Sequence, residues 1–218
     1  MNSTTLSTPA LDMSDDLRTA AAQWLKSFES RLNMGDATRL AALFAPECHY
    51  RDILAFSWTL RPAAGAQTIA DFLTSVQTKV QAKNFVLAEA RTAPRKVRRL
   101  GIEVIEAIFK FETATGCGHG VIRLLESNRE QAWVLLTTLD ELKGHEEQVG
   151  ENRPSGDAYS RNFGGANWLD QRTQERAFED RDPVVLVVGG GQNGLAVAAR
   201  LKQQGIDTLI VDKYPRIG

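Results

Sequence analysis

The chain has 218 residues, of which 43% are hydrophobic, and 26 basic against 27 acidic residues give it a formal net charge of -1. Enough apolar residues are present to build one large or two small domains. The balanced charge provides no field that would recruit nucleic acid or an anionic membrane. Cys48 and Cys117 are too few for a disulfide framework and are not spaced for a metal site.

The first residues, MNSTTLSTPALDMSDD, have neither the basic start nor the apolar centre of a signal peptide. We expect residues 1–14 to form a flexible tail and the protein to be cytoplasmic.

Helical spacing of apolar residues dominates the first part of the chain. The first helix is expected from Leu17 to Leu32, with Ser14 as N-cap and Gly35 just past its end. Asp36 can cap a second helix that continues through Phe44 and stops at Pro46. A third is expected over Gln67–Val80, after two short extended pieces at residues 48–53 and 56–60.

After Lys83 the apolar pattern changes to a period of two, which predicts antiparallel strands near residues 85–90, 102–113, 118–126 and 132–139. The expected turns carry Pro94, Gly101, the Gly116/Gly118/Gly120 cluster and Ser127-Asn128. The basic run from Arg95 to Arg99 is interpreted as a solvated turn.

Helices followed by a long meander predict an α+β domain over residues 15–147, in which a curved antiparallel sheet wraps a helix. This order resembles the cone fold of nuclear transport factor two and ketosteroid isomerase, as do Trp24 and the Trp58, Gly65, Ile69 series. The resemblance implies a sheet closed around an apolar pocket, but a fold does not assign a reaction.

Candidate polar side chains in this domain are interpreted as structural. His49 and Asp52 lie on alternate sides of one strand, so only one can face a pocket, and no third partner is visible. His119 is expected to pack or hydrogen-bond. Trp133 and Phe109 are expected in the core.

Residues 148–182 are polar and predict a linker that contains a short helix within residues 166–178. Residues 183–218 then combine a strand over Val184–Val188, a G-x-G-x-x-G turn, a helix from Leu195 to Gln204, and a second strand over Thr208–Val211. This order predicts the first βαβ unit of a Rossmann-type α/β domain.

Each part of the motif has a physical role in binding a dinucleotide. Gly189 allows a tight turn, Gly191 lets the backbone approach a pyrophosphate, Gly194 lets the helix pack close to the strand, and Asp212 can accept hydrogen bonds from the ribose. The predicted cofactor-binding residues are Gly189, Gly190, Gly191, Gln192, Asn193, Gly194, Asp212, Lys213 and Arg216. The fingerprint alone fits FAD or NAD(P).

Gly189, Gly191, Gln192, Gly194, Asp212, Arg216 and Gly218 also resemble the opening FAD motif of the flavin-containing monooxygenases. LDELKGHEE and NWLDQRTQERAFEDRDPVVLVVGGGQ resemble the junction between a cone domain and the FAD module in relatives of that family. The resemblance implies the N-terminal portion of a monooxygenase that uses FAD, NADPH and dioxygen on a small-molecule substrate. The NADPH site and the catalytic residues would lie outside these residues.

Two alternatives stay open from the sequence. The chain could be an NAD(P)-dependent reductase or dehydrogenase, although Gln192 and the Arg216-Ile217-Gly218 ending favour FAD. It could instead be a non-catalytic binding or dimerising cone module with a remnant nucleotide motif. We expect no metal, and a homodimer, if one forms, through the cone domain.

Overall fold

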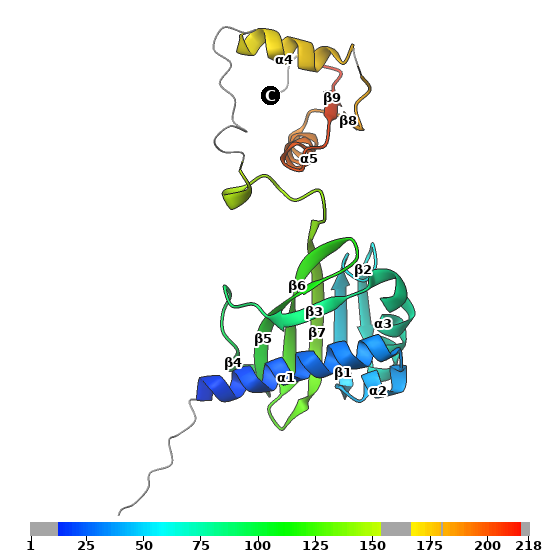
Figure 1. The fold of residues 1–218 in the computed structure, drawn as a ribbon, viewed down its shortest axis with the longest axis vertical. Helices are drawn as coiled ribbons and strands as arrows, with labels where there is room; N and C mark the ends of the chain where they lie inside the picture. The colour runs from blue at the N-terminus through cyan, green and yellow to red at the C-terminus, as the bar shows by residue number, and fades with distance from the viewer. Residues whose placement is uncertain (1–12, 154–166, 180, 215–218) are drawn as a thin grey trace, which may run out of the picture. The chain divides into compact units, whose positions relative to one another are not determined.

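The computed structural model describes residues 13–153, 167–179 and 181–214 (Figure 1). The chain divides into two compact units, an N-terminal unit of residues 1–142 and a C-terminal unit of residues 143–218. No helix in the described part of the chain is long and apolar enough to cross a membrane.

The N-terminal unit is built on a seven-stranded mixed sheet in the order β2-β1-β7-β6-β5-β3, with β4 also paired to β5. Among the described strands of this unit, β1 and β7 form the only parallel pair, and the meander strands pair antiparallel as predicted. The elements are α1 (Met13–Met34), α2 (Ala37–Ala41), β1 (Phe44–Ile53), β2 (Leu60–Ala64), α3 (Ala66–Val80), β3 (Lys83–Leu87), β4 (Arg95–Arg99), β5 (Ile102–Glu112), β6 (Gly116–Leu125) and β7 (Asn128–Leu142).

Helix α1 crosses one face of this sheet (Figure 1) and supplies much of the core. Trp24 and Phe28 are 2% and 0% exposed, and their rings stack with centroids 5.1 Å apart. The Trp24 indole N–H donates to the carbonyl of Leu43 at 3.1 Å, so the polar edge of the ring is satisfied in the core. Ser14 lies inside α1 and is not its N-cap, because the helix begins at Met13. Two acidic residues in the first turn favour the positive end of the helix dipole.

The chain enters the sheet earlier than the sequence predicts. Asp36 caps α2 by accepting from the Arg39 N–H, as expected. However, β1 starts at Phe44 and passes through Pro46, which we had placed at the end of a helix. Pro46 lies where the β1–β7 register shifts, so its missing N–H costs no ladder hydrogen bond.

Three further predictions of local structure are wrong for identifiable reasons. Strand β2 begins at Leu60, because the Asp52 carboxylate holds the residues just before it in a loop. The basic run Arg95–Arg99 is strand β4 and not a turn, because two of its arginines bind Glu106 on the neighbouring strand. The glycine cluster lies within β6, where a Cβ at Gly120 would collide with the Phe109 ring.

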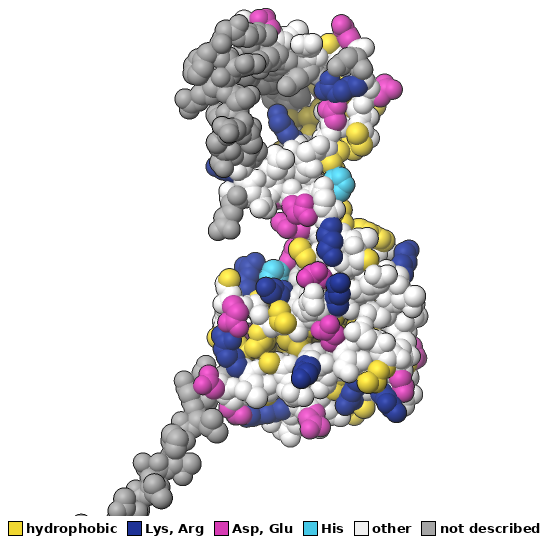
Figure 2. Space-filling model, in the orientation of Figure 1, with side chains coloured by type: hydrophobic (Ala, Val, Ile, Leu, Met, Phe, Trp, Pro, Cys, Tyr) yellow, Lys and Arg dark blue, Asp and Glu magenta, His cyan; other side chains and the backbone are white. Residues whose placement is uncertain are grey.

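Aromatic side chains fill the inside of the curved sheet. The rings of Phe85 and Phe111 stack at 5.2 Å, and Phe109 lies 5.9 Å from each of them. Phe28 meets Phe85 edge-on at 5.2 Å. These rings therefore form a packed part of the hydrophobic core. Figure 2 shows basic and acidic side chains interspersed on the face of this unit that carries α1.

The C-terminal unit contains η1 (Gly150–Asn152), α4 (Trp168–Ala177), β8 (Val185–Val188), α5 (Gln192–Gln203) and β9 (Thr208–Val211). Strands β8 and β9 pair in parallel with Val185 opposite Thr208, and α5 connects them, which is the predicted βαβ unit. Helix α5 begins three residues before the predicted start, because Gly191 serves as its N-cap. The predicted fold class, an α+β cone followed by a βαβ unit, is confirmed.

Among the described residues of this unit, α5 covers one face of the β8–β9 sheet. The side chain of Val187 lies 3.3 Å from the Cβ position of Gly194, so it points at α5. Its neighbours Leu186 and Val188 point to the other face and are 55% and 82% exposed.

Candidate nucleotide-binding site

The glycine turn after β8 has the backbone shape that the motif requires. Gly189 has φ of 104°, a conformation that a residue with a Cβ adopts only under strain. Its N–H donates to the Val211 carbonyl at 2.8 Å, which continues the parallel ladder into the turn. The turn is therefore fixed to the end of β9 as well as to β8.

The glycines of the turn differ in what surrounds them. A Cβ at Gly194 would collide with the carbonyl oxygen of Gly189, so only glycine lets α5 start this close to the strand. At Gly191, by contrast, no atom lies within 4 Å of the Cβ position. The backbone there is open to a ligand, which is the arrangement that close approach of a pyrophosphate needs.

The N-terminus of α5 faces the same turn. The first bond of the helix runs from the Leu195 N–H to the Gly191 carbonyl at 3.0 Å. The N–H groups of Gln192, Asn193 and Gly194 precede it and have no carbonyl one turn earlier to bind. Together with the positive end of the helix dipole, these groups favour an anion.

Asp212 connects the end of β9 to the glycine turn. Its carboxylate accepts from the Gly190 N–H at 2.6 Å and from the Tyr214 N–H at 2.9 Å. These two hydrogen bonds lower the pKa of Asp212 below its ordinary range, so the side chain is a carboxylate at neutral pH. The sequence predicted an acceptor for the ribose, but it gave no sign that Asp212 also braces the turn.

The remaining predicted site residues are distributed around this centre. Gln192 and Asn193 are exposed on the first turn of α5, and Gly190 is buried beneath the Asp212 carboxylate. The Lys213 ammonium lies 4.8 Å from the centre of the Tyr214 ring. Arg216 and Gly218 lie outside the described residues.

In the N-terminal unit, Asp52 is a structural residue. It is 0% exposed and accepts from the backbone N–H groups of Ala55, Phe56 and Ser57 and from the hydroxyls of Ser57 and Thr137. A carboxylate with this many donors has no free lone pair to act as a base. The interpretation of Asp52 as structural therefore agrees with the contacts.

The other polar candidates of this unit also have identifiable partners. Tyr50 shares a 2.8 Å hydrogen bond with Thr137, and burial raises the pKa of its phenol well above the ordinary value. His119 pairs with Asp140 across β6 and β7. His49 is exposed on the opposite side of β1 from Asp52. Among the described residues, no group of three or more His, Cys, Asp or Glu could hold a metal ion.

Comparison with known proteins bears on the C-terminal unit. Residues 187–218 match the family model described as NAD(P)-binding Rossmann-like domain. No curated protein matches the sequence of this chain. The C-terminal unit thus carries a Rossmann-like element of the type that binds nucleotide cofactors.

Solved structures similar to the chain have a cystatin-like fold. One is a domain from Nostoc punctiforme, with 14% identity over 60% of this chain and 80% of that chain and a TM-score of 0.43. Another is a protein from Methylobium petroleophilum, with 12% identity over 57% and 78% and a TM-score of 0.39. An NTF2-like protein from Novosphingobium aromaticivorans has 12% identity over 57% and 82% and a TM-score of 0.37. Identities this low say nothing about activity.

Proposed function

We propose that the chain supplies the adenine-nucleotide half of a cofactor site in an FAD-dependent oxidoreductase, a monooxygenase that also uses NADPH and dioxygen. One observation carries the nucleotide part of this proposal. The open backbone at Gly191, the N-terminus of α5 and the Asp212 carboxylate converge on one turn. The match of residues 187–218 to an NAD(P)-binding Rossmann-like model also supports a nucleotide-binding site.

The chemistry of the turn fits an adenine dinucleotide group by group. The N–H groups of Gln192 and Asn193 would hold the pyrophosphate, where two negative charges meet the positive end of the helix. Asp212 would accept from the ribose hydroxyls through the lone pairs that Gly190 and Tyr214 leave free. The flavin, when bound, supplies the redox chemistry, and these residues bind and orient the other half of the molecule.

FAD is preferred over NAD(P) on the residue types of the motif. Gln192 and the Arg216-Ile217-Gly218 ending match the flavoprotein pattern. The family description favours an NAD(P)-dependent reductase as the second candidate. In that case Asp212 would select NAD over NADP, because the carboxylate would repel the 2′-phosphate of NADP.

Titration of the 218-residue chain with ADP tests the nucleotide part, since ADP contains the ribose and pyrophosphate but no redox group. We expect saturable binding that Asp212→Ala weakens by roughly 10- to 100-fold, the value of a charge-assisted hydrogen bond. Asp182→Ala is the matched control, because Asp182 is an exposed aspartate of the same unit outside the turn. Equal affinity of both variants for ADP would show that Asp212 does not bind the ribose.

Competition against bound ADP then separates the two cofactors. Stronger displacement by FAD than by NADH or NADPH supports the flavoprotein. Stronger displacement by NADH identifies the dehydrogenase or reductase alternative.

A further inference from the structure

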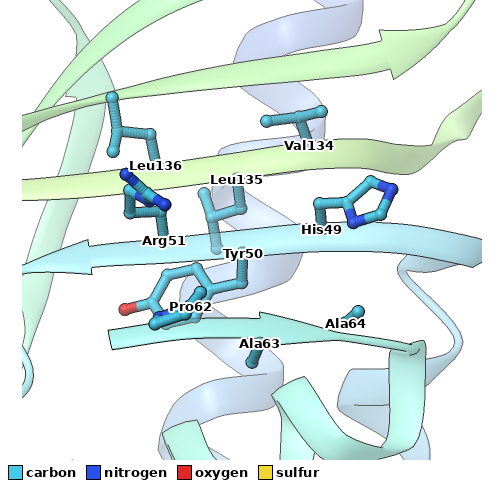
Figure 3. A pocket seen from close by; sticks show the side chains of 9 residues that line it. All are labelled: His49, Tyr50, Arg51, Pro62, Ala63, Ala64, Val134, Leu135 and Leu136. Atoms are coloured by element: carbon cyan, nitrogen blue, oxygen red, sulfur yellow. The ribbon is translucent and has the colours of Figure 1, made fainter. Parts of the chain in front are cut away.

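The N-terminal unit contains a hollow, far in sequence from the glycine turn, whose residues are those of a small-molecule site. It is open to solvent on one side and has a volume of about 570 Å³, within the range of ligand pockets in proteins. Strands β1, β2 and β7 line it (Figure 3), with His49, Arg51, Pro62, Ala64, Val134 and Leu136 as the principal side chains.

Burial along the strands shows that this hollow lies on the outer face of the sheet. Tyr50 and Leu135 are 2% and 0% exposed, so they point to the aromatic core. Side chains alternate along a strand, and their neighbours His49, Arg51, Val134 and Leu136 therefore point outward. The pairing places Arg51 opposite both Leu136 and Pro62, which puts a cation beside the apolar side chains of the hollow.

Within the described ranges of the chain, the cation in this hollow has no partner. No described residue makes a hydrogen bond or ion pair with the Arg51 guanidinium, and the exposed His49 ring lies edge-on to the Trp133 ring, with centroids 6.4 Å apart. An exposed arginine beside apolar side chains offers a planar fork of donors that fits a carboxylate.

A basic cluster next to the hollow adds to the positive charge. Arg123 is paired across the strands with Val134, which is itself opposite His49. Arg95, Arg99 and Arg123 all contact Glu106, at 2.9 to 3.0 Å, so three guanidiniums share one carboxylate and a net charge of +2 remains. Along this side of the hollow the charge is complementary to an anion.

We propose that this hollow binds a planar, apolar organic anion, an aromatic carboxylate whose ring covers Val134 and Leu136 and whose carboxylate pairs with Arg51. This site goes beyond the proposed oxidoreductase function and does not depend on it. An apolar floor of this size with one unpaired arginine favours such a ligand over a free inorganic anion, which would leave the floor wet.

The test measures binding of the probe naphthalene-2-carboxylate to the whole chain by equilibrium dialysis. We expect one bound molecule per chain, and at least about tenfold weaker binding of the neutral naphthalene-2-carboxamide, because a charge-assisted hydrogen bond is lost. Arg51→Met should weaken binding of naphthalene-2-carboxylate by a similar factor. Arg91→Met, the same change at an exposed arginine that does not line the hollow, should leave the affinity unchanged.

Several outcomes would overturn the proposal. They are the absence of saturable binding, equal affinities for the acid and the amide, and equal affinities of the two arginine variants. Sedimentation velocity provides a separate check on a second copy of the chain as the occupant. A dimer that persists with the probe, together with no effect of Arg51→Met on binding, would assign this face to self-association instead. Circular dichroism on each variant shows whether the fold is kept, and ADP binding by Arg51→Met should match the wild type.

Discussion

Replacement of Glu106 by glutamine tests whether the arginine cluster on β4, β5 and β6 stabilises the fold. The carboxylate is 10% exposed at its side chain and faces Arg95, Arg99 and Arg123. Burial alone would raise the pKa of Glu106, but the hydrogen bonds from these arginines outweigh it and lower the pKa from 4.5 to about 2.

The sign and size of the effect follow from that shift. A carboxyl group whose folded pKa is depressed adds stability above its unfolded pKa, and this stability is lost as the pH falls toward the folded pKa. A difference of this size corresponds to roughly 3 kcal/mol, which we reduce to roughly 2 kcal/mol because the arginines are partly exposed to solvent. Most of the loss should fall between about pH 4.5 and 2.

Urea unfolding of wild type and Glu106→Gln at a series of pH values measures this contribution. At pH 7 the variant should be less stable by roughly 2 kcal/mol. The difference should shrink as the pH is lowered, because protonation of Glu106 removes its contribution in the wild type, while other carboxyl groups titrate equally in both proteins. Glu103→Gln is the control, since Glu103 pairs with Lys96 at 3.1 Å but is 58% exposed. A difference between wild type and Glu106→Gln that stays constant with pH would refute the reasoning.

Three further predictions concern the core, the sheet and the cofactor. Trp24→Ala should lower the free energy of unfolding by roughly 3 to 5 kcal/mol in chemical denaturation, since the ring is 2% exposed; a loss under 1 kcal/mol would contradict its place in the core. Gly120→Ala should cost roughly 1 to 3 kcal/mol, because the new methyl group meets the Phe109 ring, whereas Gly144→Ala, with open space at its Cβ, should show only the cost of its positive φ. The 218-residue chain should elute from gel filtration with little bound FAD, because Leu186 and Val188 leave one face of a two-stranded sheet in water; a yellow, stoichiometric complex would show this expectation wrong.

Elements with strong local patterns were predictable from the sequence. The period of α3 and the β8–glycine–α5–β9 series depend on neighbours within a few residues, and they appear as expected. Thr208–Val211 has its predicted bounds. Gly35, just past α1, has the positive φ that a helix C-terminus uses.

Elements controlled by distant contacts were not predictable. The strand identity of Arg95–Arg99 depends on Glu106 and Arg123, which lie on two other strands. The place of Gly118 and Gly120 in β6 depends on the rings of Phe111 and Phe109 on β5, and that of Gly116 depends on the backbone of Glu141 on β7. The periodicity of the sequence indicates neither the strand nor the position of the glycines, because both depend on packing across the sheet.

The candidate site shows the same division. The glycines and Asp212 follow from spacing, whereas the contact of Asp212 with Gly190 requires the turn to be built first. The outward position of Arg51 follows from the burial of its neighbours Tyr50 and Asp52, which only the packed sheet reveals. Alternation along β1 alone separated His49 from Asp52 but could not say which of them was buried.

Counting hydrogen-bond donors distinguishes the two carboxylates that the sequence raised as functional candidates. An ionised carboxylate has about four acceptor positions. Asp52 receives bonds from three backbone N–H groups and two hydroxyls and is 0% exposed, so no ligand can reach it without breaking the loop that it holds. Asp212 receives two backbone bonds and lies at the surface, which leaves about half of its acceptor positions for a ligand. Of the two, only Asp212 combines a fixed position with spare acceptor capacity, and a binding carboxylate needs both.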